Sequence, residues 1–277
     1  MISERVLLVE TRQEDSPPSL PRGVLDRSAS AKRIRVSRYP TSQALQPFAD
    51  SHWIIEWTVA EDEPQQQRVL SSPNANIVVA EGDTALFGVA RGVEARTLRG
   101  SGCAVGLRFR VGGIRPFLGG PVADLTGRKV PPFCVTHQTE AAMEALILGQ
   151  TRHDDMVRAM EAIILPRIPP PDPTIDLISS MIHSVREQDG QKRAEALAAE
   201  FDLSLRTLQR LFHDYVGVSP KWVIRRYRLQ DAAYLLSEGD NLKIAALASD
   251  LGYFDQAHMN RDFGRMFGCS PAQYQSA

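Results

Sequence analysis

The stretch Leu208-Gln-Arg-Leu-Phe-His-Asp-Tyr-Val-Gly-Val-Ser-Pro220 recurs in altered form as Met259-Asn-Arg-Asp-Phe-Gly-Arg-Met-Phe-Gly-Cys-Ser-Pro271. The identical positions all fall at one offset: Arg210, Phe212, Gly217, Ser219 and Pro220 match Arg261, Phe263, Gly268, Ser270 and Pro271. Upstream, Leu197-Ala198 recurs as Leu247-Ala248, with one residue gained in the second copy. A repeat of this length indicates two copies of one supersecondary unit.

Each copy predicts two short helices joined by a tight turn. An alanine-rich helix is followed by a break, at Phe201–Leu203 in the first copy and at Leu251–Phe254 in the second. Ser204 and Asp255 come directly after these breaks, and both residue types are favoured as helix N-caps. Two helices with a turn of three or four residues form the helix-turn-helix pattern.

The second helix of each copy, predicted at about 204–215 and 255–267, has two different faces. At about 100° per residue, an apolar stripe that includes Phe212 and Phe263 lies opposite a polar face. The polar faces carry Arg206, Gln209 and Arg210 in the first copy, and His258, Asn260 and Arg261 in the second. Arg, Gln and Asn have the donors and acceptors that match base edges in the major groove, whereas an ordinary solvated face is the alternative.

A third helix, predicted from Ser219-Pro220 to about Leu236, connects the copies. At 1.5 Å per residue it would be roughly 25 Å long, against about 34 Å between successive major grooves. Its first part carries four cations: Lys221, Arg225, Arg226 and Arg228. Of these we predict Lys221, Arg225 and Arg228 as phosphate contacts. The open alternative is solvation of the helix and packing of the arginine stems.

This part of the chain resembles the AraC/XylS family of bacterial transcription regulators over about residues 191–274. The resemblance is carried by Ser204–Phe212, Gly217–Pro220, Leu247–Tyr253, Arg261–Phe263 and Gly268–Tyr274. It implies an all-α domain with two helix-turn-helix units, each placing its second helix in a major groove of double-stranded DNA. It also implies a role as an activator, with RNA polymerase as a partner. The DNA-reading roles that it implies fall on Arg206, Gln209, Arg210, Gln256, His258, Asn260 and Arg261.

The N-terminal half has a different pattern. Short apolar or alternating runs at 52–59, 76–80, 85–90 and 103–111 predict strands, and 139–148 and 154–165 predict helices. Strands at this spacing are typical of a sandwich or a small barrel. We expect an α+β chain whose β-barrel, cupin-like sensor half is followed by helices. Ala49–Trp53 and Val105–Leu118 resemble the sensor half of a subgroup of the same family. Such domains bind a small-molecule effector or a second subunit, so an effector and a homodimer are both expected.

Composition suggests the domain limits. We predict a loose N-terminal leader at 1–32, a β-rich sensor domain with trailing helices at 33–168 and a proline-rich linker at 169–173. The DNA-binding domain follows at 174–277, with Thr174 as its first N-cap. Four of the five linker residues are proline, which neither a helix nor a central strand tolerates.

A basic surplus lies in the N-terminal half. Residues 84–130 hold eight basic and two acidic residues, and Arg108 and Arg110 alternate with the apolar positions of a predicted strand. If these arginines point into a barrel, they predict an anionic effector such as a carboxylate or phosphate. The alternative is that both arginines face water.

The remaining features exclude several classes of protein. The formal net charge is -1, and residues 190–277 carry eleven basic and ten acidic residues, so charge alone does not indicate nucleic acid. No apolar run is long enough for a membrane span, and the N-terminus lacks the apolar core of a secretory signal, so we expect a cytoplasmic protein. We predict no metal, no cofactor and no catalytic site, hence no enzyme. The alternatives are a protein-interaction module that uses the helix-turn-helix surfaces and a β-barrel enzyme fused to a DNA reader.

Overall fold

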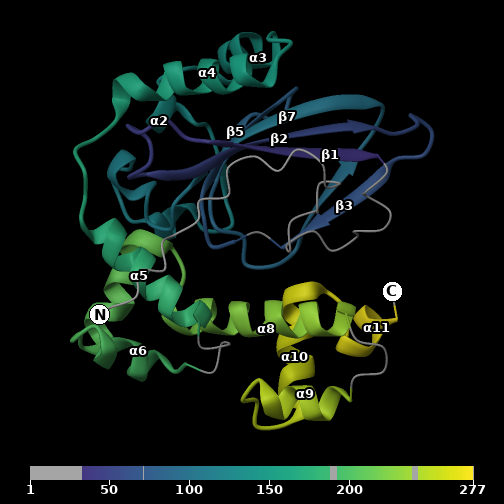
Figure 1. Ribbon diagram of the computed structural model, residues 1–277, viewed down its shortest axis with the longest axis vertical. Helices are drawn as coiled ribbons and strands as arrows, with labels where there is room; N and C mark the ends of the chain where they lie inside the picture. Colours follow the sequence, from purple (N-terminus) through teal and green to yellow (C-terminus); the bar gives the residue numbers. More distant parts are fainter. Residues whose placement is uncertain (1–32, 71, 188–191, 239–242, 277) are drawn as a thin grey trace, which may run out of the picture.

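The computed structural model describes residues 33–70, 72–187, 192–238 and 243–276. The predicted leader at 1–32 lies outside these ranges. A sheet-rich N-terminal half with two covering helices lies against a helical C-terminal half (Figure 1). The predicted α+β organisation is therefore confirmed at this level.

One antiparallel sheet dominates the N-terminal half. Its strands are β1 (Ile34–Pro40), β2 (Ala49–Thr58), β4 (Asn76–Ala80), β5 (Ala85–Phe87), β7 (Ser101–Phe109) and β8 (Lys129–Val130), in the order β1-β2-β7-β4-β5-β8. Strands β3 (Gln65–Val69) and β6 (Glu94–Leu98) pair only with each other in a second, two-stranded sheet. Within the described ranges the sheets do not close, so the predicted closed barrel is wrong. The edge strand β8 has only two residues and offers too short a ladder for a closing strand.

One face of the six-stranded sheet is covered by helices. Helix α3 (Glu140–Leu148) and helix α4 (His153–Ile164) follow the short helix α2 (Phe133–Thr136) and lie across this face (Figure 1). The helices contribute Met143, Ile147, Met156, Met160 and Ile164, and the strands contribute Ile54, Ile77, Val79, Val105 and Leu107. Thr139 caps α3, because its side chain accepts a hydrogen bond from the Ala142 amide at 3.3 Å.

The opposite face of the sheet carries two tryptophans lying on glycines. In the β2–β7 register, Trp53 is opposite Gly106 and Trp57 is opposite Gly102. A Cβ added to Gly106 would lie 2.0 Å from the Trp53 ring, and one added to Gly102 would lie 2.1 Å from the Trp57 ring. These indoles therefore occupy the space that a side chain would need on β7. Both tryptophans remain partly exposed.

The C-terminal half is all α-helical between its described limits. It consists of α5 (Thr174–Glu187), α6 (Ala194–Glu200), α7 (Leu205–Leu211), α8 (Pro220–Glu238), α9 (Ile244–Asp250), α10 (Gln256–Phe267) and α11 (Pro271–Gln275). A π-helical turn, η4 (Phe212–Val216), extends α7. Thr174 is the first helical residue of α5 rather than its cap, since the Asp172 carboxylate accepts a hydrogen bond from the Thr174 amide at 2.9 Å.

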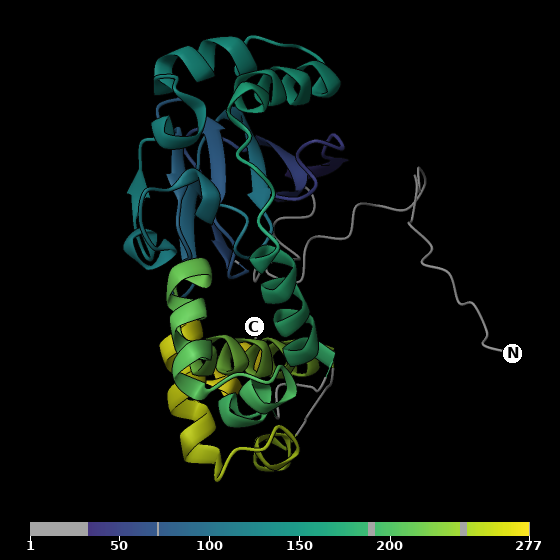
Figure 2. The same cartoon turned by 90° about the vertical axis from the view of Figure 1, so that its left-hand side faces the viewer.

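The two halves lie against each other (Figure 2). Apolar and polar contacts join them. Leu70, Val89 and Val111 of the N-terminal half belong to the apolar core of the helical half. The 3-10 helix η2 (Val122–Leu125) lies against η4, and the Thr126 hydroxyl beside it donates to the Gly217 carbonyl at 2.6 Å. On the other side, the Val93 amide donates to the Met266 carbonyl at 3.2 Å. Both helix-turn-helix units are thus attached to the N-terminal half.

Candidate nucleic-acid interface

The first unit comprises α6, a three-residue turn and α7. Asp202 has a positive φ of 52° and reverses the chain, and the Leu203 amide returns to the Ala198 carbonyl at 2.9 Å. Ser204 caps α7 as predicted, accepting a hydrogen bond from the Thr207 amide at 3.1 Å. Leu208 is fully buried on the inner side of α7. The outer side presents its predicted reading residues to solvent: Arg206, Gln209 and Arg210 are all exposed.

The second unit has the same construction in α9 and α10. Gly252 has a φ of 71°, and the Tyr253 amide returns to the Ala248 carbonyl at 2.9 Å. Asp255 caps α10 as predicted, with a 2.6 Å hydrogen bond from the His258 amide to its carboxylate. Met259 and Phe263 are fully buried. Of the predicted reading residues, Gln256, His258 and Arg261 are exposed, and Asn260 is half-buried.

A buried carboxylate organises the polar side of α10. Asp262 is 6% exposed and accepts a hydrogen bond from Arg225 of α8 at 3.3 Å. Nε2 of His258 lies 3.6 Å from the other oxygen of the same carboxylate. Burial, and then the charge of Asp262, raise the pKa of the Tyr253 hydroxyl, which keeps that group neutral. Asp262 therefore holds the Arg225 guanidinium and the His258 imidazole, both predicted to contact DNA, beside α10, and sequence reasoning did not identify it.

The cations of α8 have separate surroundings. Lys221 is exposed, Arg225 binds Asp262, and Arg228 lies over the Tyr253 ring at 5.1 Å. Arg226 is fully buried, and its guanidinium donates to the Leu70 carbonyl at 3.3 Å and to the Gln230 side chain at 2.9 Å. Burial lowers its pKa. Arg226 belongs to the contact between the two halves, so it is not available to a phosphate in this conformation.

The arginines predicted to bind an effector are engaged within the chain. Arg110, which directly follows β7, donates to Asp176 at 2.7 Å and to Ser179 at 2.9 Å, so it connects the end of that strand to α5. Arg108 lies 3.3 Å from the carboxylate of Asp50 and remains half-exposed. Burial raises the pKa of Asp50, while Arg108 and Arg110 oppose that shift.

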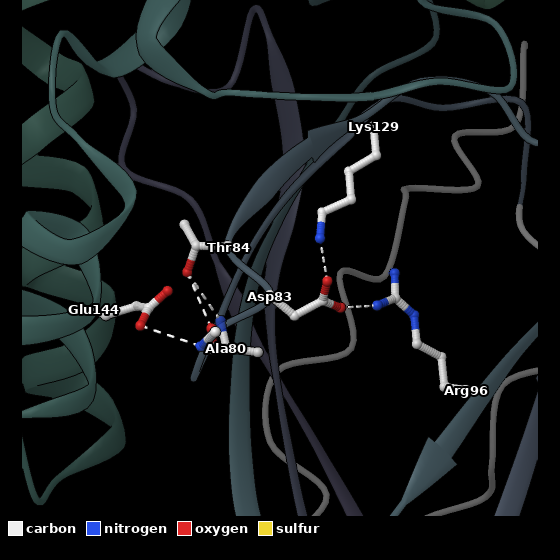
Figure 3. Close-up of polar contacts among 7 residues, drawn as sticks. Ala80, Asp83, Thr84, Arg96, Lys129 and Glu144 are labelled. Carbon is white, nitrogen blue, oxygen red and sulfur yellow. Dashed lines mark hydrogen bonds and ion pairs between the residues drawn. The ribbon is translucent and has the colours of Figure 1, made fainter.

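Other cations of the basic stretch are also neutralised. At the β4–β5 turn, the Asp83 carboxylate lies between Arg96 and Lys129 and forms an ion pair with each (Figure 3). The same turn is joined to α3, because the Gly82 amide donates to Glu144 at 3.2 Å. In the described part of the chain, no three His, Cys, Asp or Glu side chains gather as metal ligands would, and no helix is long and apolar enough to cross a bilayer.

A buried histidine was absent from the sequence-based candidates. His52 of β2 is fully buried and its Nε2 lies 3.1 Å from the carboxylate of Glu161 on α4. Burial lowers the pKa of His52, although Glu161 opposes the shift. For Glu161, burial raises the pKa, but hydrogen bonds from Ser42 and His52 outweigh it and the net shift is downward. This pair connects the sheet to its covering helix and is remote in sequence.

Two helix-turn-helix units, joined by the single helix α8 and each with an exposed polar face, define a bipartite helix-turn-helix domain. Residues 197–277 match a family described as "Helix-turn-helix domain", and residues 37–131 match one described as "Domain of unknown function (DUF6597)". The C-terminal domain is therefore of the AraC/XylS helix-turn-helix type, which confirms the prediction.

Two curated relatives match part of the chain. The chain is 30% identical over 99 residues to the RCS-specific HTH-type transcriptional activator RclR of Escherichia coli, covering 35% of this chain and 34% of the relative. It is 38% identical over 79 residues to the HTH-type transcriptional activator RhaS of Escherichia fergusonii, covering 28% of each. The matched part thus spans about a third of these relatives. Among solved structures, ToxT from Vibrio cholerae aligns over 88% of this chain and 98% of its own, at 12% identity and a TM-score of 0.38.

Proposed function

We propose that the protein is a sequence-specific DNA-binding transcription regulator. In this proposal α7 and α10 enter adjacent major grooves of double-stranded DNA, and the protein acts as an activator, as RclR and RhaS are named. The observation that carries the proposal is that α7 and α10 each have one buried apolar side and one exposed polar side. Leu208 and Met259 are buried on one side, while Arg210 and Arg261 are exposed at equivalent positions on the other.

The connecting helix supports simultaneous reading by both units. Helix α8 has 19 residues, which gives a length of about 28 Å at 1.5 Å per residue. Major grooves on one side of DNA repeat at about 34 Å, so a rigid helix of this size suits two neighbouring grooves. Non-specific affinity for DNA comes from phosphates neutralised by basic residues, and a nearly neutral domain has little surplus positive charge for this. In this proposal, base contacts therefore supply much of the affinity.

The test begins by selecting fragments of the host genome with the full-length chain. Binding to a selected fragment is expected to weaken as salt rises. Arg210→Ala and Arg261→Ala should each cost about 1–3 kcal/mol and relax specificity at one position. Arg158→Ala is the matched control, because Arg158 is an exposed arginine of α4 in the other half. Equal affinity for selected and scrambled fragments would instead favour a protein-interaction module.

We also propose that the N-terminal half binds a small molecule on the tryptophan face of its sheet. Trp53 and Trp57 lie there with Ile55 between them, and all three are partly exposed. The β7 residues opposite Trp53 and Ile55 are Gly106 and Ala104. Both are small, so no large side chain of β7 covers the apolar surface. Partly exposed apolar surface of this kind favours a ligand with an apolar body.

Intrinsic tryptophan fluorescence provides a direct assay for this second proposal. A ligand seated on the indoles should change the emission of the native chain, and Trp53→Phe should weaken binding. Arg158→Gln serves as the control, because Arg158 is an exposed residue of α4, on the other side of the sheet. A ligand whose affinity is the same in Trp53→Phe and in the native chain would place the site elsewhere.

A further inference from the structure

The two helix-turn-helix units differ by one inserted residue. In the first unit Leu203 closes the turn and the cap Ser204 follows directly. In the second unit Tyr253 makes the equivalent 2.9 Å hydrogen bond to the preceding helix, but Phe254 intervenes before the cap Asp255. Phe254 is therefore the extra residue of the second copy, and it lies at the N-terminal end of α10.

The fold makes almost no use of this side chain. Phe254 is 93% exposed, whereas its neighbour Tyr253 is 7% exposed. A hydrophobic residue in the position before an N-cap often packs against the fourth helical residue, which is here Met259. Met259 is fully buried without help from the exposed phenyl ring, so that arrangement is absent. The ring is thus left in water beside the polar face of α10, where a molecule bound to that face would cover it.

The position of the ring determines which partner it can meet. The N-terminal part of a recognition helix is the part that reaches base edges. Around Phe254 the exposed predicted readers of α10 are polar: Gln256, His258 and Arg261. These groups can recognise donors and acceptors, but a thymine is distinguished in the major groove by its C5 methyl group, which requires an apolar contact.

We propose that Phe254 is a specificity-determining residue that packs against a thymine methyl group at the edge of the half-site read by α10. This inference rests on the proposed DNA-binding function. The inserted residue gives the second unit an apolar contact that the first unit lacks, because Leu203 is turned into the core.

The test uses the full-length chain and a selected DNA fragment in which each thymine of the α10 half-site is replaced, one at a time, by deoxyuridine. This replacement removes only the methyl group. At one position, the replacement is expected to weaken binding about fourfold, which is equivalent to about 0.8 kcal/mol for one buried methyl-sized group. Phe254→Ala should weaken binding to the unmodified fragment by a similar factor or more. It should also abolish the effect of deoxyuridine at that position, while Phe254→Leu retains part of it.

Two controls separate this inference from the underlying function. Arg261→Ala should weaken binding and leave the deoxyuridine effect intact, and the melting temperature of Phe254→Ala should equal that of the native chain. If Phe254→Ala binds every fragment with the affinity of the native chain, the ring does not contact DNA, and the result would favour contact with a protein partner. If its loss is the same with thymine and deoxyuridine at all positions, the methyl contact is refuted. If the native chain selects no fragment, the proposed function itself fails.

Discussion

Replacing Gly106 with alanine tests whether the Trp53 indole lies flat on strand β7. The new Cβ would be 2.0 Å from one ring carbon and 2.6 Å from the ring nitrogen. Favourable carbon contacts lie at about 3.5–4.0 Å, so the ring has to move by about 1.5 Å or more and leave the strand. Overpacking of this kind costs about 1–3 kcal/mol, and the better strand propensity of alanine returns about 0.5–1 kcal/mol. The difference is about 0–2.5 kcal/mol, and we expect a net loss of about 1 kcal/mol in the free energy of unfolding.

Urea unfolding followed by circular dichroism measures this loss, and the linear extrapolation gives each free energy. Gly119→Ala is the matched control, because an added Cβ meets nothing within 4 Å there. The decisive comparison is a double-mutant cycle with Trp53→Ala, in which Gly106→Ala should become neutral or slightly stabilising. The reasoning is refuted if Gly106→Ala costs no more than Gly119→Ala, or if its cost is unchanged in the Trp53→Ala background.

Two further predictions follow from buried polar groups. Because burial lowers the pKa of His52, the unfolded chain binds a proton near its ordinary value of about 6.5 while the native chain does not. Stability should therefore fall as the pH is lowered from 7 towards 5, and His52→Gln should flatten that slope; an unchanged slope contradicts the assignment. Arg226→Met should lower the free energy of unfolding by about 1–3 kcal/mol, because the buried Leu70 carbonyl loses a charged donor. The exposed control Lys221→Met should cost no more than about 0.5 kcal/mol, and equal losses for the two variants would rule out this role for Arg226.

Local patterns in the sequence predicted the helical half well. Ser204 and Asp255 were identified as N-caps because capping depends on the residue itself and on amides three positions away. The buried stripes through Leu208 and Met259 followed from helical periodicity alone. The exposed reading faces of α7 and α10 follow from the same periodicity.

The features that the sequence could not predict depend on distant segments. Alternation in β2 separates Trp53 from Ile54, but it cannot indicate which face α4 will cover, and the face with Ile54 is the covered one. The closed barrel was wrong for a similar reason, since closure depends on whether edge strands meet. Arg226 shares a cluster of cations with Lys221, and only the approach of Leu70, which is 156 residues away, buries it.

The contacts that hold the two halves together rely heavily on main-chain oxygens. Thr126 donates to the Gly217 carbonyl, the Val93 amide to the Met266 carbonyl, and Arg226 to that of Leu70. A carbonyl is present whatever side chain its residue carries, so the acceptors at Met266 and Leu70 survive most substitutions. Gly217 is the exception, because its φ is 84° and an added Cβ would lie 2.7 Å from the Thr126 hydroxyl. Gly217 and Met266 lie at the ends of the two reading segments. The exposed polar faces of α7 and α10, which we propose read DNA, can therefore change during evolution while the same attachment to the N-terminal half is kept.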